Sequence, residues 1–376
     1  MTMRCRLLLL AVLTVHQLGF GQYKLTIRIN SLPPNPATDV VYVAGNFNNW
    51  NPKDELCKFK KDSVGKFIIS FPNVPANDYE YKFTRGGWET VETTSDGKNI
   101  ANRVLKLMSD TVLNIDIGGW SEGKPKVIAH TMNSNVHILD TAFHIPQLNR
   151  DRRVWIYLPK NYSTSKASYP VLYMHDGQNL FDNATSFAGE WGIDDAIDSA
   201  KKQCIVVGID NGGPVRMNEY NPYDHEKFGA GQGALYVDFL AKTLKPYIDK
   251  HYRTKKDATN TIIAGSSMGG LISMYAVMKY PKVFGKAGVF SPAFWAAPAL
   301  KTDLDKMVKS STHKNVRIYF YAGEQEGNQM VIDMLYIFEA MRKKTAAKMK
   351  VKINAEGRHN EPTWRNEFPA FYNWIL

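Results

Sequence analysis

The sequence predicts an α/β protein with a doubly wound, mostly parallel sheet, preceded by a small all-β sandwich. Beyond about Asn135, apolar runs of strand length alternate with longer stretches of helical periodicity, which is typical of a parallel sheet covered by helices on both faces. Before Trp120, short runs of alternating hydrophobicity are separated by clusters of Pro, Asn, Gly and Asp, which favours a β-sandwich. With 376 residues and 44% hydrophobic content, two packed domains are expected.

The first 21 residues have the residue order of a secretory signal. Arg4 and Arg6 precede the apolar run LLLLAVLTV, and the small residues Gly19 and Gly21 follow it, ahead of Gln22. The apolar run is too short to span a bilayer. We therefore expect a signal peptide over residues 1–21 and a secreted or periplasmic mature protein without stable membrane insertion. An uncleaved anchor is the alternative.

Residues 22–120 form the predicted β-sandwich module. Its expected strands are the alternating runs KLTIRI, VVYVAG, KFIISF, YEYKFT and TVLNIDI. The polar stretch SEGKPK at 121–126 opens a linker, which we place at 121–134.

Residues 135–376 form the predicted α/β domain. Strands are expected in RRVWIYLP, PVLYMHDG, CIVVGID, NTIIAGSS, AGVFSP and VRIYFYAG. Helices are expected in LYVDFLAKTLKPYIDKHY and MVIDMLYIFEAMRKK, whose apolar residues recur with helical spacing. Neither an internal repeat nor a low-complexity segment interrupts this order.

A nucleophile motif lies between one of these strands and the helix that follows it. The residues Gly265-Ser266-Ser267-Met268-Gly269 read G-x-S-x-G, after the strand NTIIAGSS and before the periodic stretch LISMYAVMKY. A sharp bend at this place lifts a serine oxygen clear of the backbone, and the flanking glycines let strand and helix approach closely. Ser267 is therefore the predicted nucleophile.

A serine nucleophile needs a general base and an acid that orients the base. In hydrolases with this motif the acid and then the histidine follow the serine along the chain. His359, in the loop GRHNEP after a strand, is the predicted base, whereas His313 lies in a polar connection and is expected to face water. Glu326 is the predicted acid, and Glu324 is the alternative, because both follow the strand VRIYFYAG.

The oxyanion of the transition state needs two backbone donors aimed at it. One is the amide that follows the nucleophile, at Met268, and the other is expected in the loop after PVLYMHDG, at Gln178 or Gly177.

The composition argues against several other functions. The net charge is +11, but the lysines are spread along the chain without a compact basic and aromatic cluster, so nucleic-acid binding is not expected. Cys57 and Cys204 are far apart and lack ligand spacing, and His175 with Asp176 supplies only two potential ligands, so neither a disulfide framework nor a metal site is predicted. No dinucleotide fingerprint or phosphate loop accompanies the strands, so no cofactor is expected. The oligomeric state is not defined by the sequence.

A series of segments from about Val136 to the C-terminus matches a known pattern: YPVLYMHDGQNLF, GEWGIDD, RMNEYNPYD, AGSSMGGLISMYA, VFSPAFW, YAGEQEG and GRHNEPTW. With these segments the domain resembles the putative-esterase family of α/β-hydrolases. That family includes feruloyl and acetyl-xylan esterases of the first carbohydrate-esterase class, siderophore esterases, S-formylglutathione hydrolase and mycolyltransferases.

The resemblance implies Ser267 as nucleophile, His359 as base, Glu326 as acid, and the amides of Gln178 and Met268 as the oxyanion hole. It also implies a pocket lined by Asp176, Arg216, Glu219, Tyr220 and Trp295. From the residues alone, the last four could equally be packing or surface residues.

The activity that the resemblance implies is a serine esterase that removes feruloyl or acetyl groups from plant polysaccharide or oligosaccharide through an acyl-enzyme. A siderophore trilactone esterase and an acyltransferase with the same triad are alternatives, and so is a glycan-binding protein without catalytic activity.

The segments VYVAGNFNNWNP, DYEYKFTRGGWETVE and NIANR resemble the immunoglobulin-type modules that bind starch and glycogen. The sugar-binding positions of those modules correspond to Trp50, Lys82, Trp88 and Asn102. Flat indoles stack on the apolar faces of sugar rings, and Lys and Asn can bind hydroxyls. The alternative is that one or both tryptophans belong to the sandwich core. The stretch ETVETTSDGKNIA is longer than the loop expected between Trp88 and Asn102.

Overall fold

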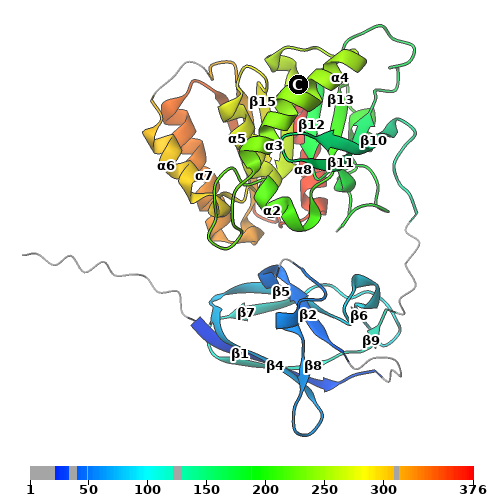
Figure 1. The fold of residues 1–376 in the computed structure, drawn as a ribbon, viewed down its shortest axis with the longest axis vertical. Helices are drawn as coiled ribbons and strands as arrows, with labels where there is room; N and C mark the ends of the chain where they lie inside the picture. The colour runs from blue at the N-terminus through cyan, green and yellow to red at the C-terminus, as the bar shows by residue number, and fades with distance from the viewer. Residues whose placement is uncertain (1–21, 34–39, 49, 122–128, 188, 309–312) are drawn as a thin grey trace, which may run out of the picture. The chain divides into compact units, whose positions relative to one another are not determined.

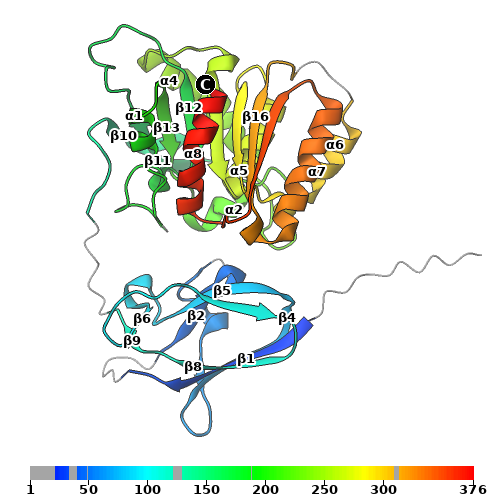
Figure 2. The same ribbon diagram turned by 180° about the vertical axis from the view of Figure 1, so that it is seen from behind.

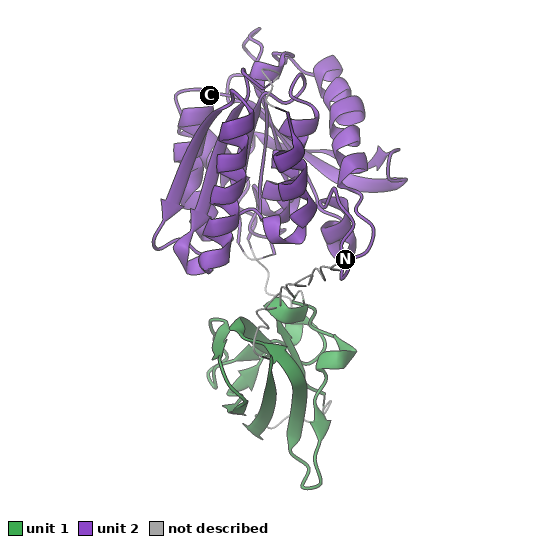
Figure 3. Cartoon of the chain, turned by 90° about the vertical axis from the view of Figure 1, so that its left-hand side faces the viewer, with its two compact units in different colours: residues 1–126 green, residues 127–376 purple. Residues whose placement is uncertain are grey.

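The computed structural model describes residues 22–33, 40–48, 50–121, 129–187, 189–308 and 313–376. The expected signal peptide and residues 122–128 of the expected linker lie outside these ranges. The chain divides into two compact units, residues 1–126 and 127–376 (Figure 3). Within the described ranges, no helix has both the length and the apolar character needed to cross a membrane.

The N-terminal unit is built of β-strands. One sheet has the strand order β3 (Lys60–Lys61), β4 (Phe67–Pro75), β1 (Gln22–Ser31) and β8 (Thr111–Asp116). A second has the order β2 (Tyr42–Gly45), β5 (Asn77–Thr84) and β7 (Arg103–Leu107), and β6 (Glu92–Thr93) pairs with β9 (Gly119–Trp120). Short 3-10 helices lie at η1 (Asn46–Asn48), η2 (Glu55–Cys57) and η3 (Trp88–Thr90).

The core of this unit draws on both larger sheets. Leu25, Ile27 and Ile29 alternate along β1 and are buried in the same cluster as Tyr81 and Phe83 of β5. The period of two places these side chains on one face of each strand, as the alternating runs predict. Cross-strand pairing joins β1 to β4 in antiparallel and to β8 in parallel orientation.

The C-terminal unit contains an eight-stranded sheet (Figure 1). Its strand order is β10 (Val136–Ile145), β11 (Arg150–Tyr157), β13 (Ile205–Ile209), β12 (Val171–His175), β14 (Thr261–Ser266), β15 (Lys286–Phe290), β16 (Arg317–Gly323) and β17 (Lys348–Asn354). The β10–β11 and β11–β13 pairs are antiparallel, and the other neighbours are parallel. The sheet is therefore mixed and mostly parallel.

Helices cover both faces of this sheet. On one face lie α1 (Ile193–Asp198) and α8 (Glu361–Ile375), which Figure 2 brings to the front. The other face packs against α3 (Gly233–Phe239), α4 (Lys245–His251), α5 (Met268–Lys279), α6 (Pro298–Lys306) and α7 (Asn328–Lys344). A π-helical segment, η6 (Leu240–Leu244), joins α3 to α4, so the helix expected at 235–252 is one element with a widened turn. The short α2 spans Arg216–Glu219.

Strands buried on two faces explain the continuous apolar runs of the sequence. In β12, Val171 and Tyr173 belong to one core and Leu172 and Met174 to the other. Because successive side chains point to opposite faces that are both buried, residues 171–174 are all apolar. The carboxyl ends of the parallel strands meet at one edge of the sheet, where open α/β sheets build their sites.

Candidate active site

Ser267 occupies a sharp bend between β14 and α5. β14 ends at Ser266 and α5 begins at Met268, and Ser267 has φ 58° and ψ −121°. A Cβ at Gly265 would lie 2.9 Å from Cδ2 of His175 and 3.0 Å from the carbonyl carbon of Gly269. Glycine is therefore required where strand and helix converge, and the bend has the geometry of a nucleophile elbow.

His359 and Glu326 contact each other at the same edge of the sheet. Nδ1 of His359 lies 2.7 Å from Oε2 of Glu326, whose side chain is only 1% exposed. Glu326 ends η9 (Glu324–Glu326), directly after β16, and His359 follows β17. An ionised carboxylate can only accept, so the contact assigns the proton to Nδ1 and leaves Nε2 as an acceptor. The side chain of His359 is 39% exposed and can reach a substrate.

The two alternatives to these residues do not take part in this contact. Glu324 is exposed and forms no hydrogen bond or ion pair with any residue that the structure describes. His313 is buried, and its Nε2 lies 3.3 Å from the carbonyl oxygen of Met278. The expectation that His313 faces water is therefore wrong, because the residue packs under α5 although its sequence neighbours are polar.

A series of hydrogen bonds connects the bend at Ser267 to the side chain of Glu326. The amide of Ser267 donates to the carbonyl of Phe290 at 2.9 Å, and the next residue, Ser291, donates its hydroxyl to Oε1 of Glu326 at 2.7 Å. The Gly323 amide also donates to Oε1, at 2.7 Å. Among the described residues, no hydrogen bond joins the Ser267 hydroxyl to His359.

The two expected oxyanion donors have free amides. Gln178 lies in η4 (Gly177–Asn179), directly after β12, and Met268 opens α5. Neither backbone amide donates to a residue in the described ranges. The turn at Gln178 is held by its neighbours, because its side-chain oxygen accepts from the Asn211 amide at 3.2 Å and its carbonyl accepts from the Thr185 hydroxyl at 2.8 Å.

Asp176 and Arg216 form a bidentate pair beside the bend. Nε and Nη2 of Arg216 lie 2.6 and 2.8 Å from the two Asp176 oxygens, and Asn211 donates to Asp176 at 2.7 Å. Burial disfavours the charged form of Asp176, but Arg216 and Asn211 outweigh this effect and lower the pKa of the carboxyl. Nη2 of Arg216 also lies 3.5 Å from the carbonyl oxygen of Ser266, next to the nucleophile.

The other expected pocket residues are divided between the interior and the surface. Glu219 is fully buried and pairs with Arg150 at 2.6 Å and with Arg152. Tyr220 is also fully buried and accepts from the Asp176 amide at 3.4 Å. The structure thus does not place Glu219 and Tyr220 on the surface of the site.

Trp295, in η8 (Phe294–Ala296), is by contrast 51% exposed. Its ring lies 6.4 Å from that of His225 and 6.2 Å from that of Phe228. These three rings form an aromatic cluster that a ligand can reach.

Two residues without a predicted role, Ser291 and Trp364, support the contact between Glu326 and His359. The indole Nε1 of Trp364 donates to the Ser291 hydroxyl at 2.9 Å, and its ring meets the His359 ring edge-on at 5.1 Å. An indole can only donate, so the Ser291 proton must go to Glu326. Trp364 also stacks on Trp191 at 5.7 Å. Ser291 and Trp364 are 73 residues apart, and no sequence spacing indicates their contact.

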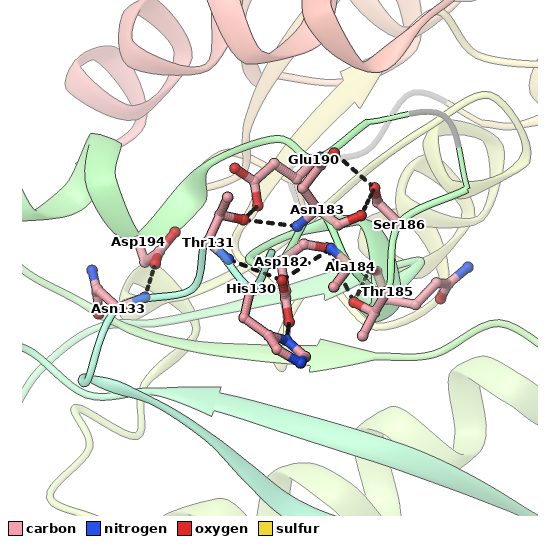
Figure 4. A network of polar contacts seen from close by, with 11 residues as sticks. His130, Thr131, Asn133, Asp182, Asn183, Ala184, Thr185, Ser186, Glu190 and Asp194 are labelled. Atoms are coloured by element: carbon pink, nitrogen blue, oxygen red, sulfur yellow. Dashed lines mark hydrogen bonds and ion pairs between the residues drawn. The ribbon is translucent and has the colours of Figure 1, made fainter. Parts of the chain in front are cut away.

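The start of this unit is tied to the segment that follows η4 and to α1 (Figure 4). Nδ1 of His130 lies 2.6 Å from Oδ2 of Asp182, and the Thr131 hydroxyl donates to Glu190 at 2.6 Å. The Asn133 amide donates to Asp194 at 2.9 Å. Burial raises the pKa of Asp194 to about 6.

The four expected sugar-binding positions of the N-terminal unit lie around β5. Trp50 and Trp88 have ring centroids 6.1 Å apart at an interplanar angle of 45°. Lys82 is half-buried, which lowers its pKa, and Asn102 donates to Glu80 at 2.9 Å. None of the four belongs to the buried cluster of this unit.

Comparison with known proteins gives a match over most of the C-terminal unit. A family model described as putative esterase matches residues 145–375. The uncharacterized protein YbbA of Bacillus subtilis is 28% identical over 186 residues, which cover 48% of this chain and 70% of YbbA.

Two further curated relatives carry the names of activities. An endo-1,4-beta-xylanase/feruloyl esterase of Xylanibacter ruminicola is 28% identical over 39% of this chain and 20% of its own length. An iron(III) enterobactin esterase of Dickeya dadantii is 25% identical over 61% of this chain and 53% of its own length. The chain therefore spans about half or less of these two relatives.

Two solved structures have a similar fold. An IroE-like serine hydrolase from Shewanella oneidensis has a TM-score of 0.52 and 21% identity, covering 64% of this chain and 78% of that one. The enterochelin esterase from Shigella flexneri has a TM-score of 0.52 and 14% identity, covering 90% of this chain and 87% of that one.

Proposed function

Because the chain belongs to the putative esterase family, we propose that it is a serine esterase that works through an acyl-enzyme. The proposal depends above all on the contact between His359 and Glu326 at the sheet edge that also carries the Ser267 bend. A serine hydroxyl is a poor nucleophile near neutral pH and needs a base held in one tautomer. His359 is that base, and Glu326 orients it.

In the proposed reaction, Oγ of Ser267 attacks the acyl carbonyl carbon while Nε2 of His359 takes the hydroxyl proton. The carbonyl oxygen becomes negative, and the amides of Met268 and Gln178 donate to it. His359 then gives the proton to the leaving alcohol, and the acyl group stays on Ser267. A water molecule that His359 deprotonates attacks the acyl carbon, and His359 then gives this proton to Oγ of Ser267 as the acyl–Oγ bond breaks. The carboxylic acid product leaves and the free serine is restored.

The proposed substrate is a feruloyl or acetyl ester on plant polysaccharide or oligosaccharide. The relative from Xylanibacter ruminicola, a xylanase and feruloyl esterase by name, supports this class. The exposed cluster around Trp295 offers an aromatic surface, and the indole pair Trp50 and Trp88 suits a sugar ring. The signal peptide expected at 1–21 suits a substrate outside the cytoplasm, in the periplasm or the medium.

A siderophore ester is a second candidate, and the relatives support it equally. Curated relatives include esterases named for enterobactin, salmochelin and triacetylfusarinine C. The same catalytic groups serve both substrates, and also an acyl transfer in which a sugar hydroxyl replaces water. Only the walls of the acyl pocket and the accepting hydroxyl differ.

Hydrolysis of a chromogenic acetate ester tests the mechanism. Ser267→Ala should lose turnover, whereas the neighbouring Ser266→Ala is the matched control and should keep it. Equal rates for wild type and Ser267→Ala would overturn the serine mechanism and leave the glycan-binding protein as the better interpretation. A panel of feruloylated oligosaccharide, acetylated xylan and a catecholate trilactone then identifies the ester.

A further inference from the structure

Two cationic side chains occupy neighbouring positions at the amino ends of the parallel strands, and neither has a full set of hydrogen-bond or ion-pair partners. Lys286 opens β15 and Arg317 opens β16, and the two residues are register partners in these parallel strands. Register partners point to the same face of a sheet. Lys286 is only 8% exposed, and within the described ranges its ammonium group forms no hydrogen bond or ion pair.

Arg317 is only partly satisfied. Its Nη2 donates to the carbonyl of Trp374, and its guanidinium lies 4.5 Å from the centroid of the Trp374 ring. Its Nε is buried without a hydrogen-bond partner in the described part of the chain. Buried donors are nearly always paired, so the open Nε of Arg317 calls for an acceptor, and Lys286 is the register partner of Arg317 on the neighbouring strand.

The surrounding charges add to the positive field instead of cancelling it. Burial, Arg317, Lys202 and Lys255 together lower the pKa of Lys286 to about 8, and only Asp257 acts in the other direction. The carboxylate of Asp257 is already engaged, because it accepts from the Thr259 hydroxyl at 2.5 Å and from Asn260 at 2.8 Å. No acidic side chain in the described ranges comes within ion-pair distance of Lys286.

This place is separate from the candidate active site. Lys286 and Arg317 stand at the amino ends of β15 and β16, whereas Ser291 and Glu326 follow the carboxyl ends of the same strands. Lys202 and Lys255 are exposed and belong to the connections that lead into β13 and β14. The positive field at Lys286 therefore comes from three other segments of the chain.

We propose that Lys286 and Arg317 form a binding site for a small tetrahedral oxyanion, phosphate or sulfate. An ammonium group and a guanidinium group offer several hydrogen-bond donors to such an anion. Neither group has an acceptor that could bind a cation. An anion would pair both open donors and lower the cost of burying two like charges. The site is independent of the esterase function and does not rest on it.

Calorimetric titration of the full chain with inorganic phosphate, and separately with sulfate, tests the proposal. At constant ionic strength set with chloride, wild type should bind one anion per chain and its Tm should rise with anion concentration. Lys286→Gln should weaken binding by about tenfold or more, because a charge-assisted contact is lost. Lys306→Gln removes an equal charge from an exposed position and should bind like wild type.

Two results would overturn the site. One is a wild-type protein that shows no heat and no Tm shift beyond the chloride control. The other is a Lys286→Gln protein, folded by circular dichroism, that binds as tightly as Lys306→Gln. Ester turnover should be the same in both variants, so a failure here is distinguishable from a failure of the serine mechanism.

Discussion

Nδ1 of His359 lies 2.7 Å from Oε2 of Glu326, although the two residues are 33 positions apart in the chain. The parallel pairing of β16 with β17 brings them together, since Gly323 is the register partner of Asn354 and each strand ends just before its functional residue. The contact is thus a consequence of sheet topology. A change that alters the length of either loop would separate the two side chains.

Glu326→Gln should lower kcat by about a thousandfold, because an amide can donate to Nδ1 and hold the imidazole in the wrong tautomer. Glu324→Gln should remain within about twofold of wild type, because the Glu324 side chain is exposed and forms no hydrogen bond or ion pair with a described residue. Steady-state rates on a soluble acetate ester provide the comparison. A larger loss at Glu324 would make that residue the acid.

Trp364→Phe should lower kcat by about tenfold with an unchanged KM, because the ring is kept but the donor to Ser291 is lost. Trp374→Phe, on the same helix, is the control, since no hydrogen bond joins its indole nitrogen to Ser291 or Glu326 among the described residues. The KM-against-kcat split separates this effect from a general loss of fold. If both variants have equal kcat, Trp364 has no positioning role.

Trp50→Ala should weaken retention on insoluble polysaccharide while small-ester turnover stays the same, because the indole pair lies in the N-terminal unit. Leu56→Ala removes an exposed apolar side chain from the same unit and should be retained normally. Pull-down on starch and on xylan measures both. Equal retention of the two variants would leave this unit without a role in glycan binding.

Lys286→Met should raise the stability measured in phosphate-free buffer at pH 7 by about 1–3 kcal/mol. The folded pKa of Lys286, about 8, is below its ordinary value of 10.5. Between these pH values the unfolded chain binds more protons than the folded one, so wild-type stability rises with pH across this window.

The advantage of Lys286→Met should therefore shrink as the pH rises from 8 to about 10.5. Denaturant unfolding at pH 7 and at pH 10 provides the measurement. An advantage that is the same at both pH values would contradict the unpaired charge at this position.

The sequence alone predicts the parts of the fold that obey a simple period. The strands around Ser267 are apolar along most of their length because both faces are buried, and G-x-S-x-G marks the bend by itself. β10 is different, since its register shifts between Ile138 and Asp140 and again before Phe143, which breaks the alternation. β7 is not predicted from the sequence, because its apolar residue Val104 is exposed and its residues RVLKL do not alternate regularly between polar and apolar.

Of the candidate site, the sequence predicts only the residues that can be chosen by their order along the chain. Ser267, Glu326 and His359 follow from the order of nucleophile, acid and base. Long-range contacts, such as that of Ser291 with Trp364, depend on how α8 packs and have no local pattern. The resemblance alone places Glu219 and Tyr220 in the pocket, but both side chains are fully buried in the structure.

The network around Asp182 and Asp194 decides where the chain can be shortened (Figure 4). A truncated C-terminal unit that starts at Val136 would lack His130, Thr131 and Asn133, and both buried carboxylates would lose hydrogen-bond donors. The true beginning of this unit is thus several residues ahead of its first strand. A truncation that starts before His130 should melt as one transition near the full-length value, and one that starts at Val136 should melt earlier.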